Sequence, residues 1–223
     1  VDNSRRPMPF KVPRYEVEVV NESIGNDVIS SNLKGRGVQS VAGGYLYELY
    51  YSVMDSSNKR RNYFASAWPN ENGGWEVRNK YFKGCLGHKG MSFLQGAVDR
   101  LGVFEGYFDF LSWKVEHPQD PASILVLNSL SFLQAAKGRS NQFGSIELYF
   151  DHDKAGKSAA QQFIRDVHGS IDCSFKYAGF KDYNEKLVAD LRQIEKSIVK
   201  PMPFSVENGF GITRCYMNTQ LCK

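Results

Sequence analysis

Acidic side chains follow three apolar runs of the sequence, each where the run gives way to a helix-like segment. Glu105 and Asp109 lie in FEGYFD, Asp151 and Asp153 in DHDKAG, and Asp182 in FKDYNE. Carboxylates this close repel one another unless a cation lies between them. Oxygen ligands suit hard cations such as Mg²⁺ or Mn²⁺, which activate nucleophiles and stabilise charge on phosphate. The pattern therefore predicts a Mg²⁺ or Mn²⁺ site that acts on phosphate groups.

The local spacing indicates how these carboxylates are presented. Glu105 ends a strand-like run and Gly106 makes the turn, so Asp109, four residues on, shares a helix face with Glu105 if the helix starts at the glycine. Asp151 and Asp153 project to the same side of an extended stretch. With Glu105 opposite, they are placed to hold one or two metal ions.

Each acidic residue also has a purely structural interpretation. Asp153 and Asp182 stand where helix N-caps stand. Glu105 alone fits a surface position, and His152 fits an outward-pointing spacer. The combination of motifs favours a metal site, with Asp151 as the firmest ligand. The two roles of Asp153 are compatible, because one oxygen can cap the helix while the other faces the metal.

The elements that must position these residues alternate in the second half of the chain. Short apolar strands are predicted at 101–104, 123–128, 145–150 and 170–178, and helices at 106–115, 129–138, 154–169 and 182–197. This rhythm predicts a four-stranded parallel sheet flanked by helices. Functional groups gather at the carboxyl ends of such strands, where the three acidic motifs stand.

The first half of the chain has a different pattern. The first twenty residues are predicted to be irregular, and a short helix is predicted at 22–34. Three strand-like runs at 45–53, 62–69 and 74–82 predict an antiparallel meander. The chain is therefore an α/β protein with a smaller α+β antiparallel subdomain in residues 1–99, the metal-binding domain in 100–198 and a tail in 199–223. KPMPFSV at 200–206 echoes RPMPFKV at 6–12, and we interpret both as extended edge segments without an assigned function.

A basic and aromatic segment precedes the first parallel strand. Between residues 76 and 100 only Glu76 and Asp99 oppose five basic side chains, and aromatic residues are interleaved. By composition alone this is a solvated strand edge over core aromatics, but the acidic motifs downstream favour nucleic-acid or nucleotide binding. The candidate contacts are Arg78, Lys80, Lys83 and Lys89, with Lys154, Lys157 and Lys181 beside the acidic motifs. Lys154 and Lys157 equally suit a role in offsetting the acidic pocket.

Composition narrows the possible partners of the protein and its expected cellular compartment. The 223 residues carry a net charge of +4, which permits a polyanionic partner without requiring one. No apolar run reaches the roughly 18 residues of a membrane span, and no membrane partner is expected. The four cysteines form no Cys-x-x-Cys pair or zinc-ligand spacing with histidines, so we expect reduced cysteines and a cytoplasmic protein. Because the first residue is Val1, we expect a processed chain or a fragment of a longer product.

Together the motifs resemble the Toprim domain, a nucleotidyl-transfer and hydrolysis module shared by primases, type IA and type II topoisomerases, OLD-family nucleases and recombination proteins. Glu105 matches the family's invariant glutamate, and Asp151 and Asp153 match its Asp-x-Asp. GFKDYNE is similar to the Lys-Asp-x-Asn stretch of primase-type members. This likeness implies a place for Asp182 in the same metal site and, less directly, for Asn184.

The resemblance extends upstream. LKGRGV (33–38) is similar to the Leu-x-x-Arg-Gly-Ile stretch before a primase core. GGWEVRNKYFKGCLGHKGMSF (73–93) resembles the basic segment that precedes Toprim in primase-like proteins of conjugative and mobilisable elements. The resemblance implies a Mg²⁺- or Mn²⁺-dependent, primase-like nucleotidyltransferase with catalytic Glu105, Asp151 and Asp153. It implies single-stranded DNA and nucleoside triphosphates as partners, with a helicase or a relaxase as the candidate protein partner, in DNA replication or mobilisation of a mobile element.

Two other functions are compatible with the same residues. A Toprim nuclease needs the same metal pocket with water as the nucleophile, and a DNA-binding accessory protein needs no catalysis. An intact acidic set argues against the accessory role, because clustered carboxylates without a cation are unfavourable. The large domains of a topoisomerase do not fit in 223 residues. Primases of this kind usually carry a zinc-binding module, which this sequence lacks.

Overall fold

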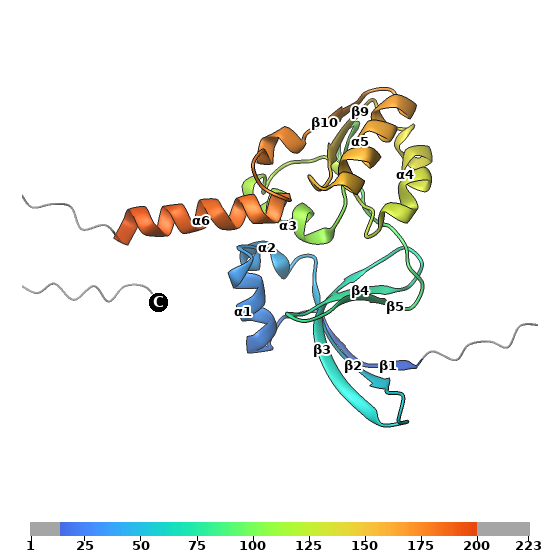
Figure 1. The fold of residues 1–223 in the computed structure, drawn as a ribbon, viewed down its shortest axis with the longest axis vertical. Coiled ribbons are helices and arrows are strands. Elements are labelled where there is room, and N and C mark those ends of the chain that lie inside the picture. The colour runs from blue at the N-terminus through green and yellow to red at the C-terminus, as the bar shows by residue number, and fades with distance from the viewer. Residues whose placement is uncertain (1–13, 200–223) are drawn as a thin grey trace, which may run out of the picture.

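Two sheets form the framework of the protein, one above the other (Figure 1). The computed structural model describes residues 14–199. The two PMPF segments and the tail after residue 199 lie outside the described residues. Within the described residues, no helix has the length and apolar character needed to cross a bilayer.

The first sheet, called sheet A, is an antiparallel meander whose strands pair in sequence order. Its strands are β1 (Tyr15–Asn21), β2 (Tyr47–Met54), β3 (Arg60–Pro69), β4 (Trp75–Arg78) and β5 (Lys83–Leu86). Helices α1 (Asp27–Gly35) and α2 (Gln39–Ala42) connect β1 to β2. Helix α1 begins later than predicted because Asn26 caps it, accepting hydrogen bonds from the N–H groups of Val28 and Ile29.

Two predictions for this half are wrong. The first twenty residues contain β1, which pairs with β2 from Tyr15 opposite Val53 onward. The run 74–82 is not one strand, because it turns at Asn79 and returns as β5. The Asn79 side chain accepts the N–H groups of Tyr81 and Phe82, both at 2.9 Å. These bonds satisfy the backbone locally and favour a turn over a continuous ladder.

The second sheet, called sheet B, has the order β10-β9-β7-β8-β6. Its strands are β6 (Ser92–Leu94), β7 (Arg100–Phe104), β8 (Ser123–Val126), β9 (Ser145–Tyr149) and β10 (Ser170–Asp172). The four predicted strands are present and parallel. The sequence did not predict β6, which adds an antiparallel edge beside β8.

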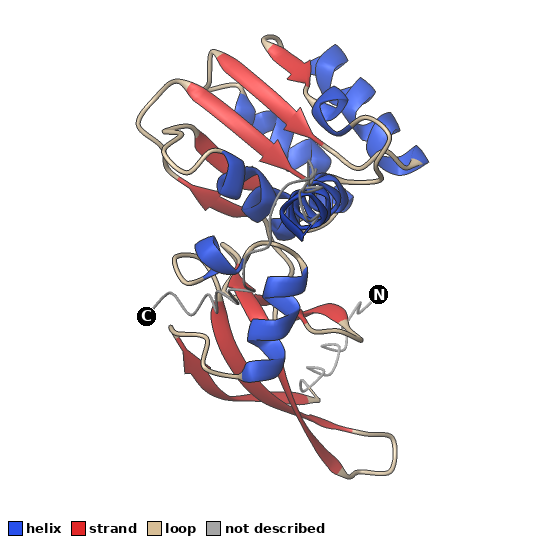
Figure 2. Ribbon diagram, turned by 90° about the vertical axis from the view of Figure 1, so that its left-hand side faces the viewer, coloured by secondary structure: helices blue, strands red, loops and turns tan. Residues whose placement is uncertain are grey.

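Helices lie on both sides of sheet B (Figure 2). They are α3 (Tyr107–Glu116), η1 (Leu130–Phe132), α4 (Leu133–Ser140), α5 (Lys154–Asp166), η2 (Ser174–Tyr177) and α6 (Tyr183–Val199). The strand predicted at 170–178 is short, because the chain enters η2 after Asp172. Helix α4 continues through Gly138 to Ser140, so this glycine does not end it. A Cβ at Gly138 would meet nothing within 4 Å, and a glycine in the helix costs only about 1 kcal/mol.

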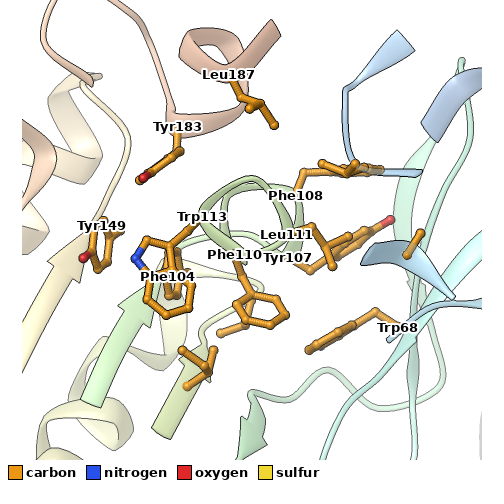
Figure 3. Close-up of a cluster of buried hydrophobic side chains, with 14 of the residues drawn as sticks. Trp68, Phe104, Tyr107, Phe108, Phe110, Leu111, Trp113, Tyr149, Tyr183 and Leu187 are labelled. Carbon is orange, nitrogen blue, oxygen red and sulfur yellow. The ribbon is translucent and has the colours of Figure 1, made fainter. Parts of the chain in front are cut away.

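Aromatic side chains of α3 join the two sheets (Figure 3). Trp68 of β3 lies against Tyr107, with ring centroids 6.1 Å apart and planes 9° apart, and against Phe110 at 5.6 Å. On the sheet B side, Phe104 stacks on Tyr149 at 4.6 Å. One continuous core therefore fixes sheet A against the parallel sheet, and the candidate site lies where the two meet.

Candidate metal and nucleotide site

Three carboxylates from separate segments converge at the carboxyl edge of sheet B. Asp109, Asp151 and Asp182 each offer an oxygen, and the three oxygens lie within 4.8 Å of one another. Asp109 stands in the first turn of α3, after β7, and Asp151 directly follows β9. Opposite ligands of Mg²⁺ are about 4.2 Å apart, twice the metal–oxygen distance. Adjacent ligands of the same octahedral ion are about 3.0 Å apart, so the three aspartate oxygens would have to move inward to share one cation.

Helix starts hold two acidic residues in place. Asp153 caps α5, its Oδ1 accepting the N–H of Gly156 at 2.9 Å. Asp182 caps α6, its Oδ1 accepting the N–H of Glu185 at 2.8 Å. Both N-cap interpretations are thus confirmed. Gly156 allows the start of α5 to approach Asp151, because a Cβ on Gly156 would overlap the Asp151 carbonyl oxygen.

Glu105 lies beside Asp151 but outside the cluster of three oxygens. Its Oε2 accepts the Asp151 N–H at 3.4 Å. Burial, then the charge of Asp151, raises the pKa of Glu105 to about 7, and Asp153 adds to the effect. Asp153 is solvent-exposed. Metal ligation by Glu105 and Asp153 stays a prediction.

Burial and neighbouring charge raise the pKa of two of the clustered carboxylates, Asp109 and Asp151. Burial, followed by the charges of Asp182 and Asp151, raises the pKa of Asp109 to about 8. Burial and Asp182 also raise the pKa of Asp151, against the opposing charges of Lys181 and Lys83. The neighbouring carboxylates therefore add to the effect of burial, and a bound cation would offset their repulsion.

Cationic side chains complete the same cavity of about 110 Å³. Arg36, Arg78, Lys83 and Lys181 line it together with the three aspartates. The Arg36 and Arg78 guanidinium carbons lie 4.3 and 5.4 Å from the ring centroid of Phe108. The ring thus holds two cations beside the acidic cluster, an arrangement suited to phosphate oxygens bound to a metal.

The other predicted basic residues lie outside this cavity. Lys80 lies in the β4–β5 turn, with Nζ 5.5 Å from the Tyr81 ring centroid. Lys154 opens α5 and is exposed, and Lys157 lines a separate shallow groove. The Lys89 carbonyl accepts a hydrogen bond from Asn72. Nucleic-acid binding by these lysines stays a prediction.

Arg36 is the main site residue that sequence reasoning missed, although LKGRGV was its signal. Its Nη1 donates to Asn184 Oδ1 at 2.9 Å. Asn184 Nδ2 donates back to the Arg36 carbonyl and to Ser112 Oγ, both at 2.9 Å. The Asn184 backbone N–H donates to Asp109 Oδ1 at 3.2 Å. Asn184 thus connects Arg36 to the acidic cluster, rather than contributing its side chain to the three-oxygen set.

Asn128 and Glu76 also line the cavity, and no sequence pattern indicated them. Asn128 follows β8 with a positive φ of 59°. Its Nδ2 donates to the Gly90 carbonyl and to Ser92 Oγ, which ties the end of β8 to β6.

Comparisons with known proteins agree with this fold. Residues 102–187 match the family model described as Toprim-like, and residues 18–87 match a model described as Domain of unknown function (DUF8464). No curated protein matches the chain. The crystal structure of the primase fragment of bacteriophage T7 primase-helicase protein is similar, with 18% identity and a TM-score of 0.50 over 88% of this chain and 83% of that one.

A second bacteriophage T7 structure is also similar. It is the lagging-strand DNA polymerase interacting with primase domains of two gp4 subunits bound to an RNA/DNA hybrid and dTTP, with 22% identity and a TM-score of 0.45 over 70% of this chain and 84% of that one. The likenesses to solved structures concern the fold alone. The predicted Toprim resemblance and fold class are confirmed: residues 102–187 match the Toprim-like model, and the fold of the chain is similar to that of the primase fragment.

Proposed function

We propose that this protein is a metal-dependent nucleotidyltransferase that synthesises primers on single-stranded DNA. One observation carries the proposal: three carboxylates and four cationic side chains line a single cavity at the carboxyl edge of a parallel sheet. A nucleoside triphosphate bound with Mg²⁺ presents a cation and a row of phosphate oxygens. The cavity offers ligands of the matching charge for both.

The residues divide into two sets by charge. Asp109, Asp151 and Asp182 would hold Mg²⁺ or Mn²⁺, which supplies charge stabilisation and an activated hydroxyl in phosphoryl transfer. Arg36 and Arg78 would bind phosphate oxygens, and their contacts with Phe108 restrict their movement. Glu105, with its pKa raised to about 7 by burial and Asp151, is suited to accept a proton from the attacking hydroxyl near neutral pH.

The cationic side of the cavity favours transfer over hydrolysis. A nuclease acts on one phosphodiester group, whereas a triphosphate substrate and its pyrophosphate product require several cations. Arg36, Arg78, Lys83 and Lys181 all line the cavity. On the sequence resemblance we further propose a role in DNA replication or mobilisation of a mobile element, with a helicase or relaxase as protein partner, in the cytoplasm.

Primer synthesis tests the proposal directly. The chain is incubated with single-stranded DNA, nucleoside triphosphates and either Mg²⁺ or Mn²⁺, and new oligonucleotides are resolved by length. We expect metal-dependent products from the wild type and from Glu195→Gln, an exposed acidic residue of α6. Products should fall at least about 100-fold in Asp151→Asn, the scale of losing an electrostatic stabiliser.

Two outcomes would overturn this function. If the wild type makes no metal-dependent product, even when a short primer is supplied for extension, nucleotidyl transfer is excluded. If the chain cleaves the DNA and Asp151→Asn abolishes the cleavage, the protein is a nuclease. Circular dichroism and urea unfolding of Asp151→Asn separate loss of activity from loss of folding.

A further inference from the structure

Exposed aromatic side chains gather at the turn between β4 and β5, outside the carboxylate cavity. Tyr81 is 88% exposed, Phe82 48% and Tyr63 of β3 41%. With Tyr51 they line a mainly apolar groove of about 450 Å³, here called the aromatic groove. Contiguous exposed aromatic surface of this kind marks a binding site more often than a structural need.

The exposure of these rings follows from an ordered turn. Asn79 Oδ1 accepts the N–H groups of Tyr81 and Phe82 at 2.9 Å. The Asn79 N–H donates to the Phe82 carbonyl at 3.0 Å, and its Nδ2 donates to the Phe64 carbonyl at 3.3 Å. The turn is therefore bonded within itself and to β3, so it holds the Tyr81 ring out to solvent.

The aromatic groove and the carboxylate cavity share a wall. The Phe82 ring lies directly over Gly84, because a Cβ on Gly84 would overlap it. Gly84 lines the carboxylate cavity together with Arg78 and Lys83. The charge of Lys83 also acts on the pKa of Glu105 and of Asp151. Lys83 and Gly84 are consecutive in β5 and face opposite sides of sheet A, so the cavity and the groove lie on opposite faces of the β4–β5 hairpin. Because β5 is the edge strand of sheet A, a flexible ligand that rounds this edge from the groove reaches Lys83 and the acidic cluster.

The chemistry of the groove selects a strand with flat apolar groups and a negative backbone. Arg14 lines the groove, and Lys80 lies beside the Tyr81 ring. Aromatic rings alternating with cations bind single-stranded nucleic acid, whose unpaired bases stack on the rings. In a duplex the base faces are already stacked and cannot reach the rings.

We propose that the template single strand stacks its bases on Tyr81 and Phe82 and then rounds the edge strand β5 into the carboxylate cavity. This inference rests on the proposed function, which supplies the single-stranded DNA. It adds a binding surface on sheet A that lies outside the metal site. The occupant is single-stranded DNA, favoured by the cations at the groove and by the shared wall with the cavity.

Binding of a fluorescent oligothymidine in EDTA, measured by anisotropy with the full chain, tests the inference. Removing a stacked aromatic weakens single-strand binding at least about fivefold, so Tyr81→Ala alone should reach that factor. The double substitution of Tyr81 and Phe82 to alanine should reach about 25-fold. Phe175→Ala, at a residue 68% exposed on η2, is the matched control and should bind within twofold of the wild type. Tyr81→Trp should retain binding.

Three further measurements decide the inference. Oligonucleotides carrying 5-iododeoxyuridine should crosslink within residues 79–86, and duplex DNA should compete poorly. Asp151→Asn should bind the oligothymidine normally, so groove binding can survive the failure of primer synthesis. Wild-type affinity in Tyr81→Ala and in the double variant would overturn the inference, as would crosslinks confined to other segments. If the double variant does not fold, Tyr81→Ala alone still tests the inference, because Tyr81 is almost fully exposed and its removal should not disturb the fold.

Discussion

Replacing Asp109 with asparagine tests whether burial and the neighbouring carboxylates disfavour a charge on Asp109 when no metal is bound. Burial, with the charges of Asp182 and Asp151, raises the pKa of Asp109 to about 8 from an ordinary 3.8. Below pH 4 this carboxyl is protonated in both the folded and the unfolded chain and does not reduce the free energy of unfolding. As the pH rises toward 8, the unfolded chain releases this proton more readily than the folded chain, so the free energy of unfolding falls. At about 1.4 kcal/mol per pH unit, the difference between these two pKa values limits the resulting loss in the free energy of unfolding to roughly 6 kcal/mol.

The amide removes the charge and keeps an oxygen for the Asn184 N–H, which now lies 3.2 Å from Asp109 Oδ1. The actual cost is smaller than this limit, because solvent screens the charges and the neighbouring carboxylates can move or take up a proton. We therefore expect Asp109→Asn to be about 2–4 kcal/mol more stable than the wild type at pH 8 in EDTA. At pH 5 the advantage should shrink to about 1 kcal/mol, because there Asp109 is mostly protonated in the folded wild type.

Urea unfolding at pH 5 and pH 8, with EDTA and with MgCl₂, measures these differences. Asp120→Asn is a control of opposite sign: although burial opposes it, the hydrogen bond from Arg100 lowers the pKa of Asp120, so this variant should be less stable at pH 8. Mg²⁺ should stabilise the wild type more than Asp109→Asn. Equal stability of wild type and Asp109→Asn at pH 8 in EDTA, or a difference independent of pH, would refute this free-energy cost of a charged Asp109.

Three other predictions follow from the contacts around the site. Mg²⁺ or Mn²⁺ should raise the melting temperature of the wild type at pH 8, with a smaller rise at pH 5 because protons compete for the carboxylates. A melting temperature that does not change when either metal is added would contradict the metal site. Gly156→Ala should lower the free energy of unfolding by about 1–3 kcal/mol, since its Cβ overlaps the Asp151 carbonyl; unchanged urea unfolding would show that the start of α5 moves without penalty. Asn184→Ala leaves Arg36 Nη1 without its acceptor and should cost about 1–3 kcal/mol in urea unfolding. Asn184→Asp should be no better tolerated, because its carboxylate cannot donate to the Arg36 carbonyl or to Ser112 Oγ and lies beside Asp109; unchanged urea unfolding in Asn184→Ala would contradict this role.

The sequence predicted that Asp109, Asp151 and Asp182 lie near one another because local rules govern their positions, while metal binding by the five predicted carboxylates stays a prediction. Asp151 directly follows an apolar run, and Asp153 and Asp182 stand at helix starts. Parallel strands bring such positions to one edge of the sheet. Alternation of strands and helices in the second half of the chain was therefore enough to gather Asp109, Asp151 and Asp182 into one cluster.

The secondary-structure predictions were wrong where a local hydrogen bond or turn fixes the backbone, or where a strand pairs with a segment far away in the sequence. The run 74–82 has the composition of a strand, but hydrogen bonds to Asn79 turn it back. Strand β1 depends on pairing with β2, whose paired residues lie 27 to 38 positions further along the chain. The strand predicted at 170–178 ends at Asp172 because η2 follows at once. Neither a turn fixed by one amide nor a distant pairing is visible in hydrophobic periodicity.

The cationic half of the cavity depends on how the two sheets pack. Arg36 meets Asn184 across 148 residues, and Arg78 enters the cavity from sheet A. Both positions depend on α3, because Tyr107 lies against Trp68 while Phe108 contacts both guanidinium groups. Asp109 stands in the same first turn of α3. One helical turn therefore carries a carboxylate of the acidic cluster, the ring that contacts two guanidinium groups and the contact that docks sheet A, so the acidic and basic halves of the site depend on the same packing contact.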